Sequence, residues 1–325
     1  TLFCAVTSGA DYVLHYASLL RYALVELCAG AGAAVDARVV RYPEMERQLC
    51  EWTAHAGSIQ PGDTVVYGYA EGVLAHLRAD STLEPRLEAL SVFENEHYRS
   101  ERVRLGERVL NFYACKEHGW GNISAVTMRR AAEAGAVEIL YVSKGATCDA
   151  PDAIYEQIYC PERFVTCAYD RTLADVVPRN LLLCARPALA TGTHASCRCV
   201  LEEDYAMRER ALSLLGARSL DNEAAQIAAA LARDHPSVGF AAVQFSTDYI
   251  RRAGEQRLAT PFDLANNRRP PAEARRRVIQ ARIFAVVADY LAEPSASLLL
   301  YSHPALRRPG TTLEIRATLR CAHNR

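Results

Sequence analysis

The sequence of 325 residues predicts an α/β protein with a largely parallel or mixed β-sheet. Short apolar runs rich in β-branched and aromatic residues alternate with longer stretches rich in Ala, Leu and Arg. Such alternation is typical of strands joined by helices. Half of the residues are hydrophobic, which is enough for one large domain or two smaller ones, each with its own core.

The individual elements follow from these runs. The predicted strands are 2–6, 37–41, 64–69, 108–115, 136–143, 181–186 and 238–246. The predicted helices are 12–29, 42–56, 70–79, 122–134, 204–215, 221–234 and 272–292. Two more strands are expected near the end of the sequence, at 297–301 and 311–319.

Two charged or turn-rich stretches, 81–108 and 258–277, indicate joints in the chain. The first would separate an extra N-terminal α/β segment from the main domain. We therefore predict this segment over 1–95, the main domain over 96–293 and a C-terminal β extension over 294–325.

Composition argues against several classes of protein. The formal net charge of −1 gives no reason to expect a nucleic-acid or anionic membrane partner. The start of the sequence lacks the pattern of a signal peptide, and no apolar run is long enough to cross a bilayer. Eleven cysteines without a C-x-x-C pair indicate reduced, buried thiols in a cytoplasmic protein. We expect neither a metal site nor a cofactor.

Gly119, Gly121 and Ser124 lie in the stretch H-G-W-G-N-I-S, between a predicted strand and the helix predicted from Asn122. Glycine allows a positive φ and the close approach of a ligand to the backbone. A helix N-terminus presents unpaired N–H groups and the positive end of the helix dipole. The stretch therefore predicts a site for a small anion, with a simple turn and helix cap as the alternative.

Carboxylates mark two further elements. Asp221 and Glu223 open the helix predicted over 221–234, and Asp248 follows the strand predicted over 238–246. In open α/β sheets the ligand crevice lies at the carboxyl ends of the strands, where Asp248 could serve acid–base chemistry or ligand binding. One of the helix acids could face a pair of ligand hydroxyls. The alternative is that all three acids cap helices or turns.

A third polar stretch, R-P-A-L-A-T-G-T-H-A-S-C, combines a predicted strand with a loop that contains Thr193 and His194. Its composition suits the edge of a polar pocket. A histidine in such a loop is more often a surface residue than a catalyst.

The order of these motifs resembles the nucleoside phosphorylase/nucleosidase superfamily, especially hexameric bacterial purine nucleoside phosphorylases and methylthioadenosine/S-adenosylhomocysteine nucleosidases. The stretch 108–147 resembles the strand, glycine loop, helix and second strand of that family. L-D-N-E-A-A resembles the ribose-binding V-E-M-E-A-A helix, and V-Q-F-S-T-D resembles a strand that ends in Ser-Asp. The resemblance covers about 104–252 and the helix at 272–292. It implies a mixed central β-sheet flanked by helices, and a homo-oligomer.

The resemblance implies a role for each motif residue. Ser124 would bind phosphate or an equivalent anion, in a loop shaped by Gly119 and Gly121. Glu223 would accept hydrogen bonds from the ribose hydroxyls, with Asp221 nearby.

Further residues would surround the base. Asp248 would protonate N7 of a purine as the glycosidic bond breaks. Lys144 and Gly145 would border the base, and Thr193 would line the pocket. Asn222 stands where the family has an apolar methionine beside the sugar.

The implied activity is cleavage of the N-glycosidic bond of a purine nucleoside-like small molecule. The G-D-P-x-R segment of the phosphorylases is absent from the sequence, and Tyr141 stands in place of an arginine on the strand before the base turn. Phosphorolysis, with phosphate as a co-substrate, and hydrolysis therefore both stay open. Two other functions also stay open: a non-catalytic nucleoside- or nucleotide-binding relative, and an unrelated α/β enzyme that binds a phosphorylated ligand.

Overall fold

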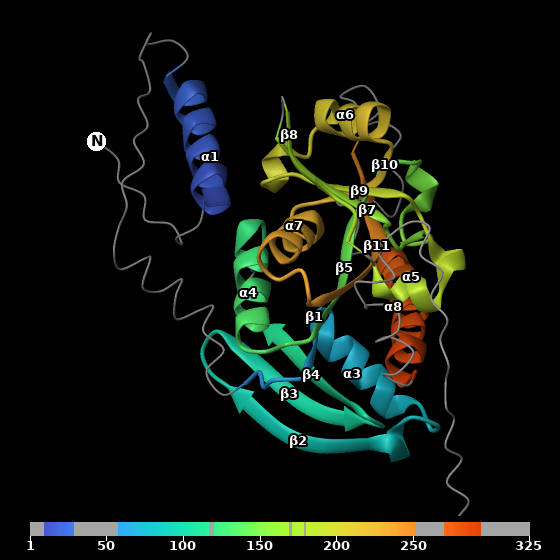
Figure 1. Cartoon of the computed structure of the whole chain (residues 1–325). Helices are drawn as coiled ribbons and strands as arrows, with labels where there is room; N and C mark the ends of the chain where they lie inside the picture. The colour runs from blue at the N-terminus through green and yellow to red at the C-terminus, as the bar shows by residue number, and fades with distance from the viewer. Residues whose placement is uncertain are drawn as a thin grey trace, which may run out of the picture.

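The computed structural model describes residues 10–28, 58–116, 120–168, 171–178, 180–250 and 270–293. These residues form a twisted central sheet with helices on both faces (Figure 1). The strands are β1 (Thr64–Gly68), β2 (Leu87–Glu94), β3 (Tyr98–Leu105), β4 (Arg108–Cys115), β5 (Glu138–Thr147), β6 (Ile158–Tyr159), β7 (Arg163–Ala168), β8 (Arg171–Val176), β9 (Thr193–Ser196), β10 (Ala217–Asp221) and β11 (Gly239–Tyr249). The helices are α1 (Ala10–Cys28), α3 (Ala70–Ala79), α4 (Asn122–Glu133), α5 (Leu181–Ala185), α6 (Tyr205–Leu215), α7 (Ala224–Asp234) and α8 (Pro270–Ala292). The predicted fold class, a mixed sheet flanked by helices, is confirmed.

The described strands join in the order β2-β3-β4-β1-β5-β10-β9-β7-β8, while β11 pairs with β5 and β6. β5 pairs in parallel with β1 and with β11. At its end, where Ala146 faces Leu220, β5 pairs antiparallel with β10. The carboxyl ends of β1, β5 and β11 therefore meet at the same edge of the sheet.

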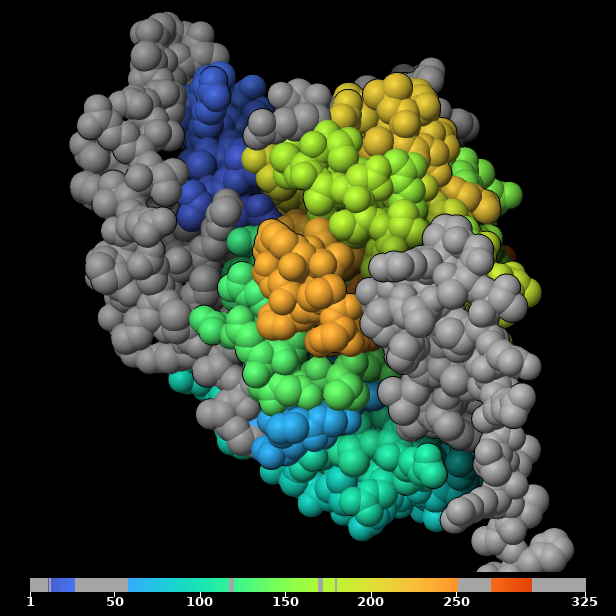
Figure 2. Space-filling view, in the orientation of Figure 1, coloured from blue at the N-terminus to red at the C-terminus, as the bar shows by residue number. Residues whose placement is uncertain are grey.

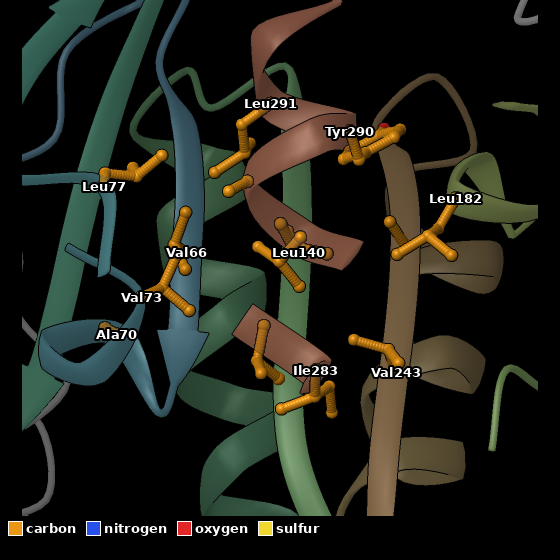
Figure 3. Packing of buried hydrophobic residues seen from close by; sticks show 14 of the residues in the cluster. Val66, Ala70, Val73, Leu77, Leu140, Leu182, Val243, Ile283, Tyr290 and Leu291 are labelled. Carbon is orange, nitrogen blue, oxygen red and sulfur yellow. The ribbon is translucent and has the colours of Figure 1, made fainter. Parts of the chain in front are cut away.

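Alternation along the strands builds a core on each face of the sheet. Val66 of β1 and Leu140 of β5 pack against α3 and α8, in a cluster that includes Ile283 (Figure 3). The residues just before them, Val65 and Ile139, pack on the opposite face beneath α4 and α7. Because both faces of these strands are buried, their sequences read as continuous apolar runs.

A buried ion pair ties α8 to the amino ends of the strands. Arg108 of β4 donates to Glu138 of β5 at 2.8 Å, and the hydroxyl of Tyr290 in α8 donates to the same carboxylate at 2.6 Å. All three side chains are buried, and the Arg108 guanidinium lies over the Tyr290 ring. The three groups thus satisfy one another's charges and hydrogen bonds away from water.

Most predicted elements inside the described ranges form, with three corrections. The strand predicted over 181–186 is helix α5, because the side chain of Asn180 accepts a hydrogen bond from the N–H of Leu182 and caps a helix there. The helix predicted from residue 221 starts at Ala224, because the preceding residues form β10. The stretch 81–108, predicted as a joint, contains the antiparallel pair β2 and β3.

The predicted boundary at residue 95 falls in the turn between β2 and β3. β1 belongs to the predicted N-terminal segment, yet it lies between β4 and β5 in the sheet. From residue 58 onward, the described part of that segment therefore shares its sheet with the main domain. The strands predicted at 2–6, 37–41, 297–301 and 311–319, the helix at 42–56 and the extension over 294–325 lie outside the described residues.

Within the described ranges, none of the helices has the length and apolar character required to cross a membrane.

Candidate active site

Four carboxyl groups gather where the carboxyl ends of β5, β10 and β11 meet the start of α7. They belong to Glu203, Asp221, Glu223 and Asp248, and we call them the acidic cluster. Glu203 interacts electrostatically with the other three carboxylates, which places all four in one neighbourhood. The cluster brings together three acids that the sequence singled out and adds Glu203.

Asp221 is a buried structural member of the acidic cluster. Its carboxylate accepts hydrogen bonds from Nε2 of Gln244 at 2.5 Å and from the N–H groups of Glu223 and Ala224, and it pairs with Nε2 of His194 at 2.8 Å. Burial raises the pKa of Asp221, but His194 and the hydrogen bonds outweigh burial and hold the pKa below its usual value. With these partners, Asp221 holds β9, β10, β11 and α7 together and is not free to bind sugar hydroxyls.

His194 is therefore neither a surface loop residue nor part of an open pocket edge. Its ring is fully buried between Asp221 and the hydroxyl of Ser219, which lies 2.8 Å from Nδ1. His194 lies in the buried strand β9, which pairs in parallel with β10, the strand that ends at Asp221.

Glu223 stands at the first turn of α7 and is partly exposed. The backbone N–H of Asn222 donates to its Oε2 atom at 3.3 Å. Burial and the charge of Asp221 raise the pKa of Glu223 to about 8, against the opposing effect of Lys144. Glu223 is thus the acid of α7 that can reach a ligand.

Asp248 is turned toward the cluster by a β-bulge. The register of β11 against β5 shifts between Ser246 and Asp248, so that Thr247 is the extra residue. The Thr247 hydroxyl donates to Asp248 Oδ1 at 2.6 Å. Burial raises the pKa of this partly exposed carboxyl above its usual value. A carboxyl of this kind can hold a proton for transfer to a ligand.

The anion site predicted at the start of α4 already contains a carboxylate. Gly121 precedes the helix with a φ of 64°, and a Cβ atom there would lie 2.8 Å from Oδ2 of Asp11. That same oxygen accepts a hydrogen bond from the N–H of Asn122 at 2.7 Å and one from Nε2 of Gln226 at 3.2 Å. Gly121 is therefore required for the close approach of Asp11, which the sequence reading missed. Gly119 lies outside the described residues.

Asp11 belongs to α1, and its hydrogen bond with the N–H of Asn122 joins the N-terminal ends of α1 and α4 (Figure 1). Figure 2 shows α1, in blue, along one side of the molecule. His15, one turn further along α1, makes an edge-on ring contact with Trp120 at 5.1 Å. In the sequence, Asp11 directly precedes the helix predicted over 12–29, a position at which an acid usually serves as a cap.

Ser124 is buried in the first turn of α4, and its hydroxyl lies 3.2 Å from the hydroxyl of Tyr67 at the end of β1. The Tyr67 ring stacks on Tyr141 of β5 with 5.5 Å between the ring centroids. Burial raises the pKa of both tyrosines well above the usual value, and both phenols feel the charge of Glu223. Two stacked aromatic rings therefore lie at this position, where the family resemblance leads one to expect an arginine in place of Tyr141.

Two predicted base-pocket residues lie beside the acidic cluster and one does not. Lys144 is exposed at the end of β5 and acts electrostatically on Glu223 and Asp248. Gly145 permits the tight crossing of β5 and β10, since a Cβ atom there would lie 2.8 Å from the carbonyl oxygen of Leu220. Thr193 begins β9 and pairs with the first residue of β10, at the end of the strand remote from Asp221.

The described residues contain no group of three or more His, Cys, Asp or Glu side chains arranged to hold a metal ion.

Comparison with known proteins identified a curated relative by sequence and several solved structures with a similar fold. No protein-family model matches the chain. Over 278 residues, 80% of its length, the chain is 30% identical to Oxidoreductase cns1 of Cordyceps militaris. The match covers 34% of that protein, so the chain spans about a third of the length of its curated relative.

Among solved structures, the chain is similar to 5′-methylthioadenosine/S-adenosyl homocysteine nucleosidase of Campylobacter jejuni, with a TM-score of 0.50 and 14% identity over 71% of this chain and 98% of that one. Purine nucleoside phosphorylase of Toxoplasma gondii gives a TM-score of 0.48 with 10% identity, over 72% of this chain and 92% of that one. The chain therefore has the nucleoside phosphorylase/nucleosidase fold that its motif order indicates, in a highly diverged sequence.

Proposed function

We propose that this chain hydrolyses the N-glycosidic bond of a purine nucleoside-like substrate. The observation that carries the proposal is the convergence of Asp248 and Glu223 on one edge of the sheet, beside the start of α4. Both carboxyls interact with Glu203 and with Lys144, although Asp248 and Glu223 come from different elements. Glycosidic cleavage requires a proton donor for the leaving nucleobase and a group that holds the sugar hydroxyls in place.

Asp248 is the proposed general acid. Because burial raises its pKa, the carboxyl keeps its proton closer to neutral pH than an exposed aspartate does. As the bond between C1′ of the sugar and N9 of the base breaks, the bonding electrons pass to the base. Asp248 then gives its proton to N7 and neutralises the leaving group. Such a general acid typically contributes roughly 10²–10⁴-fold to the rate.

Glu223 is the proposed ligand of the sugar hydroxyls. It is partly exposed at the start of α7, and its charge acts on the phenols of the stacked residues Tyr67 and Tyr141. Hydrogen bonds from vicinal hydroxyls to this carboxyl would fix the orientation of the sugar relative to Asp248.

Water rather than phosphate is the proposed nucleophile. The helix N-terminus that could bind phosphate donates instead to Asp11, and a second anion there would meet a buried carboxylate. Burial raises the pKa of Asp11, which makes its ionised form a better proton acceptor. In the balanced reaction, water attacks C1′ and passes a proton to Asp11, which releases it to solvent, while Asp248 regains a proton from solvent.

Chromatographic detection of base release from a panel of purine nucleosides, with and without phosphate, tests this proposal. We expect release without phosphate, and a loss of roughly 10²–10⁴-fold in the Asp248→Asn variant. Asp152→Asn, which changes an exposed carboxylate in the short 3-10 helix Pro151–Ala153, is the matched control and should retain activity.

Release that requires phosphate would make the chain a phosphorylase. If no nucleoside released its base but calorimetry detected binding, the chain would be a non-catalytic nucleoside-binding protein.

A further inference from the structure

We propose that Gln226 is a positioning residue for the proposed hydrolysis: its side-chain amide holds Oδ2 of Asp11 in place, so that Oδ1 is the oxygen that takes the proton of water. The inference rests on the proposed function, in which Asp11 accepts that proton. It gives a role to a polar side chain of α7 that the sequence motifs did not indicate.

The amide of Gln226 is anchored by two backbone carbonyls. Gln226 is the third residue of α7 and is partly exposed. Its Nε2 atom lies 2.8 Å from the carbonyl oxygen of Asn222 and 3.2 Å from that of Cys197. The N–H of Cys197 in turn donates to the carbonyl of Asp221 at 2.9 Å, which fixes this segment to the end of β10. The amide nitrogen of Gln226 therefore has a defined position.

Oδ2 of Asp11 lies between the starts of two helices. It accepts a hydrogen bond from Nε2 of Gln226 at 3.2 Å and another from the N–H of Asn122, the first residue of α4, at 2.7 Å. α4 and α7 pack side by side on one face of the sheet, so the core holds both donors in place (Figure 1). Two donors from different helices fix the orientation of the carboxylate, whereas a single donor would leave it free to turn.

The two oxygens of the Asp11 carboxylate are therefore not equivalent. Among the described residues, neither a side chain nor a backbone N–H donates to Oδ1. Oδ2 already accepts from two N–H groups, whereas Oδ1 keeps its lone pairs for a new donor. When water attacks C1′, one of its O–H bonds breaks and the proton passes to Oδ1, from which solvent removes it.

Gln226 also links this proton acceptor to the proposed ligand of the sugar hydroxyls. The carbonyl of Asn222, which anchors the amide, belongs to the same peptide group as the N–H of Glu223. That N–H donates to Oδ1 of Asp221 at 3.0 Å, so the peptide group is held on both sides. One amide thus sets the position of Asp11 relative to the backbone of Glu223. Fixed placement of the sugar and of the group that activates water favours the reaction.

The charges around Asp11 stay unchanged when Gln226 is replaced. The titratable or charged side chains near Asp11 are Arg198, Cys199 and Glu202, from the segment after β9, and His15, one turn along α1. Arg198 and Glu202 form an ion pair with each other, and their effects on Asp11 have opposite signs. A change in the titration of Asp11 after substitution of Gln226 therefore reports the lost hydrogen bond.

The pH dependence of kcat and KM for base release tests this role in Gln226→Met, which keeps the length of the side chain and removes its N–H groups. We expect kcat to fall roughly 10–100-fold and KM to stay within about twofold of wild type, because the proton acceptor moves while the substrate ligands stay. The rise of kcat on the acidic side should occur about one pH unit higher, because ionised Asp11 has lost a donor. Gln226→Glu also adds a like charge and should move this limb further. Gln60→Met, just before β1 at the amino end of the strands, is the matched control.

An acidic limb that stays at the wild-type pH would overturn the proposal. A higher KM at unchanged kcat would overturn it as well, because it indicates contact with the substrate. So would an equal loss at every pH together with a lower free energy of unfolding in urea, which indicates a structural role.

A second measurement does not depend on turnover. Carboxyl ¹³C NMR of aspartate-labelled protein follows the titration of Asp11, whose signal is identified by its loss in Asp11→Asn. Asp11 should titrate about one pH unit higher in Gln226→Met, and an unchanged midpoint would overturn the proposal. If wild type releases no base but this midpoint shifts, the hydrolase assignment fails and the orientation of Asp11 by Gln226 stands.

Discussion

The Oδ2 atom of Asp11 in α1 accepts a hydrogen bond of 2.7 Å from the backbone N–H of Asn122, the first residue of α4. The two residues are 111 positions apart in the sequence. A helix N-terminus attracts anions, and this one receives a carboxylate from the chain itself. The contact joins α1 to the start of α4 and is the reason for proposing water as the nucleophile.

The Asp11→Asn variant should therefore lose activity while keeping its fold. Asparagine retains an oxygen that can accept from the Asn122 N–H, but it cannot take a proton from water. We expect base release to fall by roughly 10²–10⁴-fold with little change in the free energy of unfolding. Glu26→Gln changes an exposed carboxylate of the same helix and is the control in the same chromatographic assay. Wild-type release by Asp11→Asn, or release that becomes dependent on phosphate, would contradict the role of Asp11.

The order of the motifs predicted the fold class because each motif reflects a structural requirement of its own segment, such as a positive φ or burial on both faces of a strand. The H-G-W-G-N-I-S stretch contains a glycine with positive φ, Gly121, and the run from 238 is a strand buried on both faces. The stretch 81–108 was misread because its charges suggested a loop. In β3, buried Tyr98 and Val103 alternate with charged residues, and the pattern of an edge hairpin is hidden by its arginines and glutamates.

Site membership was harder to predict, since it depends on contacts between distant segments. Glu223 and Asp248 could be proposed from the sequence because each lies beside a recognisable element. Asp11 and Glu203 were missed, as an acid near a helix start is usually a cap. Asp221 was assigned to the ligand from its motif, but its contact with Gln244 on β11 shows that it is part of the scaffold. Tertiary pairing of that kind leaves no signal in a single sequence.

Substitution of Asp221 tests the scaffold role. Asp221→Asn should lower the free energy of unfolding by about 3–5 kcal/mol, because it leaves buried donors on Gln244, Ser196 and the α7 backbone without their charged acceptor. Urea denaturation measures the loss. Glu223→Gln, two residues along, is the control and should unfold close to wild type at acidic pH. If Asp221→Asn kept full stability and lost only activity, the sugar-binding role predicted from the sequence would hold instead.

The Arg108–Glu138–Tyr290 group should dominate the attachment of α8. Tyr290→Phe removes one hydrogen bond to a buried carboxylate and should cost about 1.5–3 kcal/mol. Glu138→Gln leaves the buried Arg108 without a countercharge and should cost about 3–5 kcal/mol. Urea denaturation of Glu88→Gln provides the control, because its ion pair with Arg104 is exposed and should contribute under about 1 kcal/mol. Similar losses for the exposed and the buried carboxylate would show that burial does not strengthen this pair.

The raised pKa of Glu223 predicts how stability depends on pH. The carboxyl binds its proton up to about pH 8 in the folded chain, against an ordinary value of 4.5. The folded state therefore binds protons more tightly than the unfolded state between these values. The stabilisation is complete below the unfolded pKa and is lost as the pH rises through the folded pKa.

Wild type should consequently become less stable as the pH rises from 5 to 8, and Glu223→Gln should flatten this slope. Each pKa unit corresponds to about 1.4 kcal/mol, and solvent screening of a partly exposed group reduces the total to about 1–3 kcal/mol. Urea denaturation of both proteins at pH 5 and pH 8 measures the difference, with Glu107→Gln as the control for an exposed glutamate. The variant should gain stability relative to wild type at pH 8 only. Parallel pH dependences for wild type and Glu223→Gln would mean that Glu223 ionises freely, which would remove the reason to regard it as a constrained member of the acidic cluster.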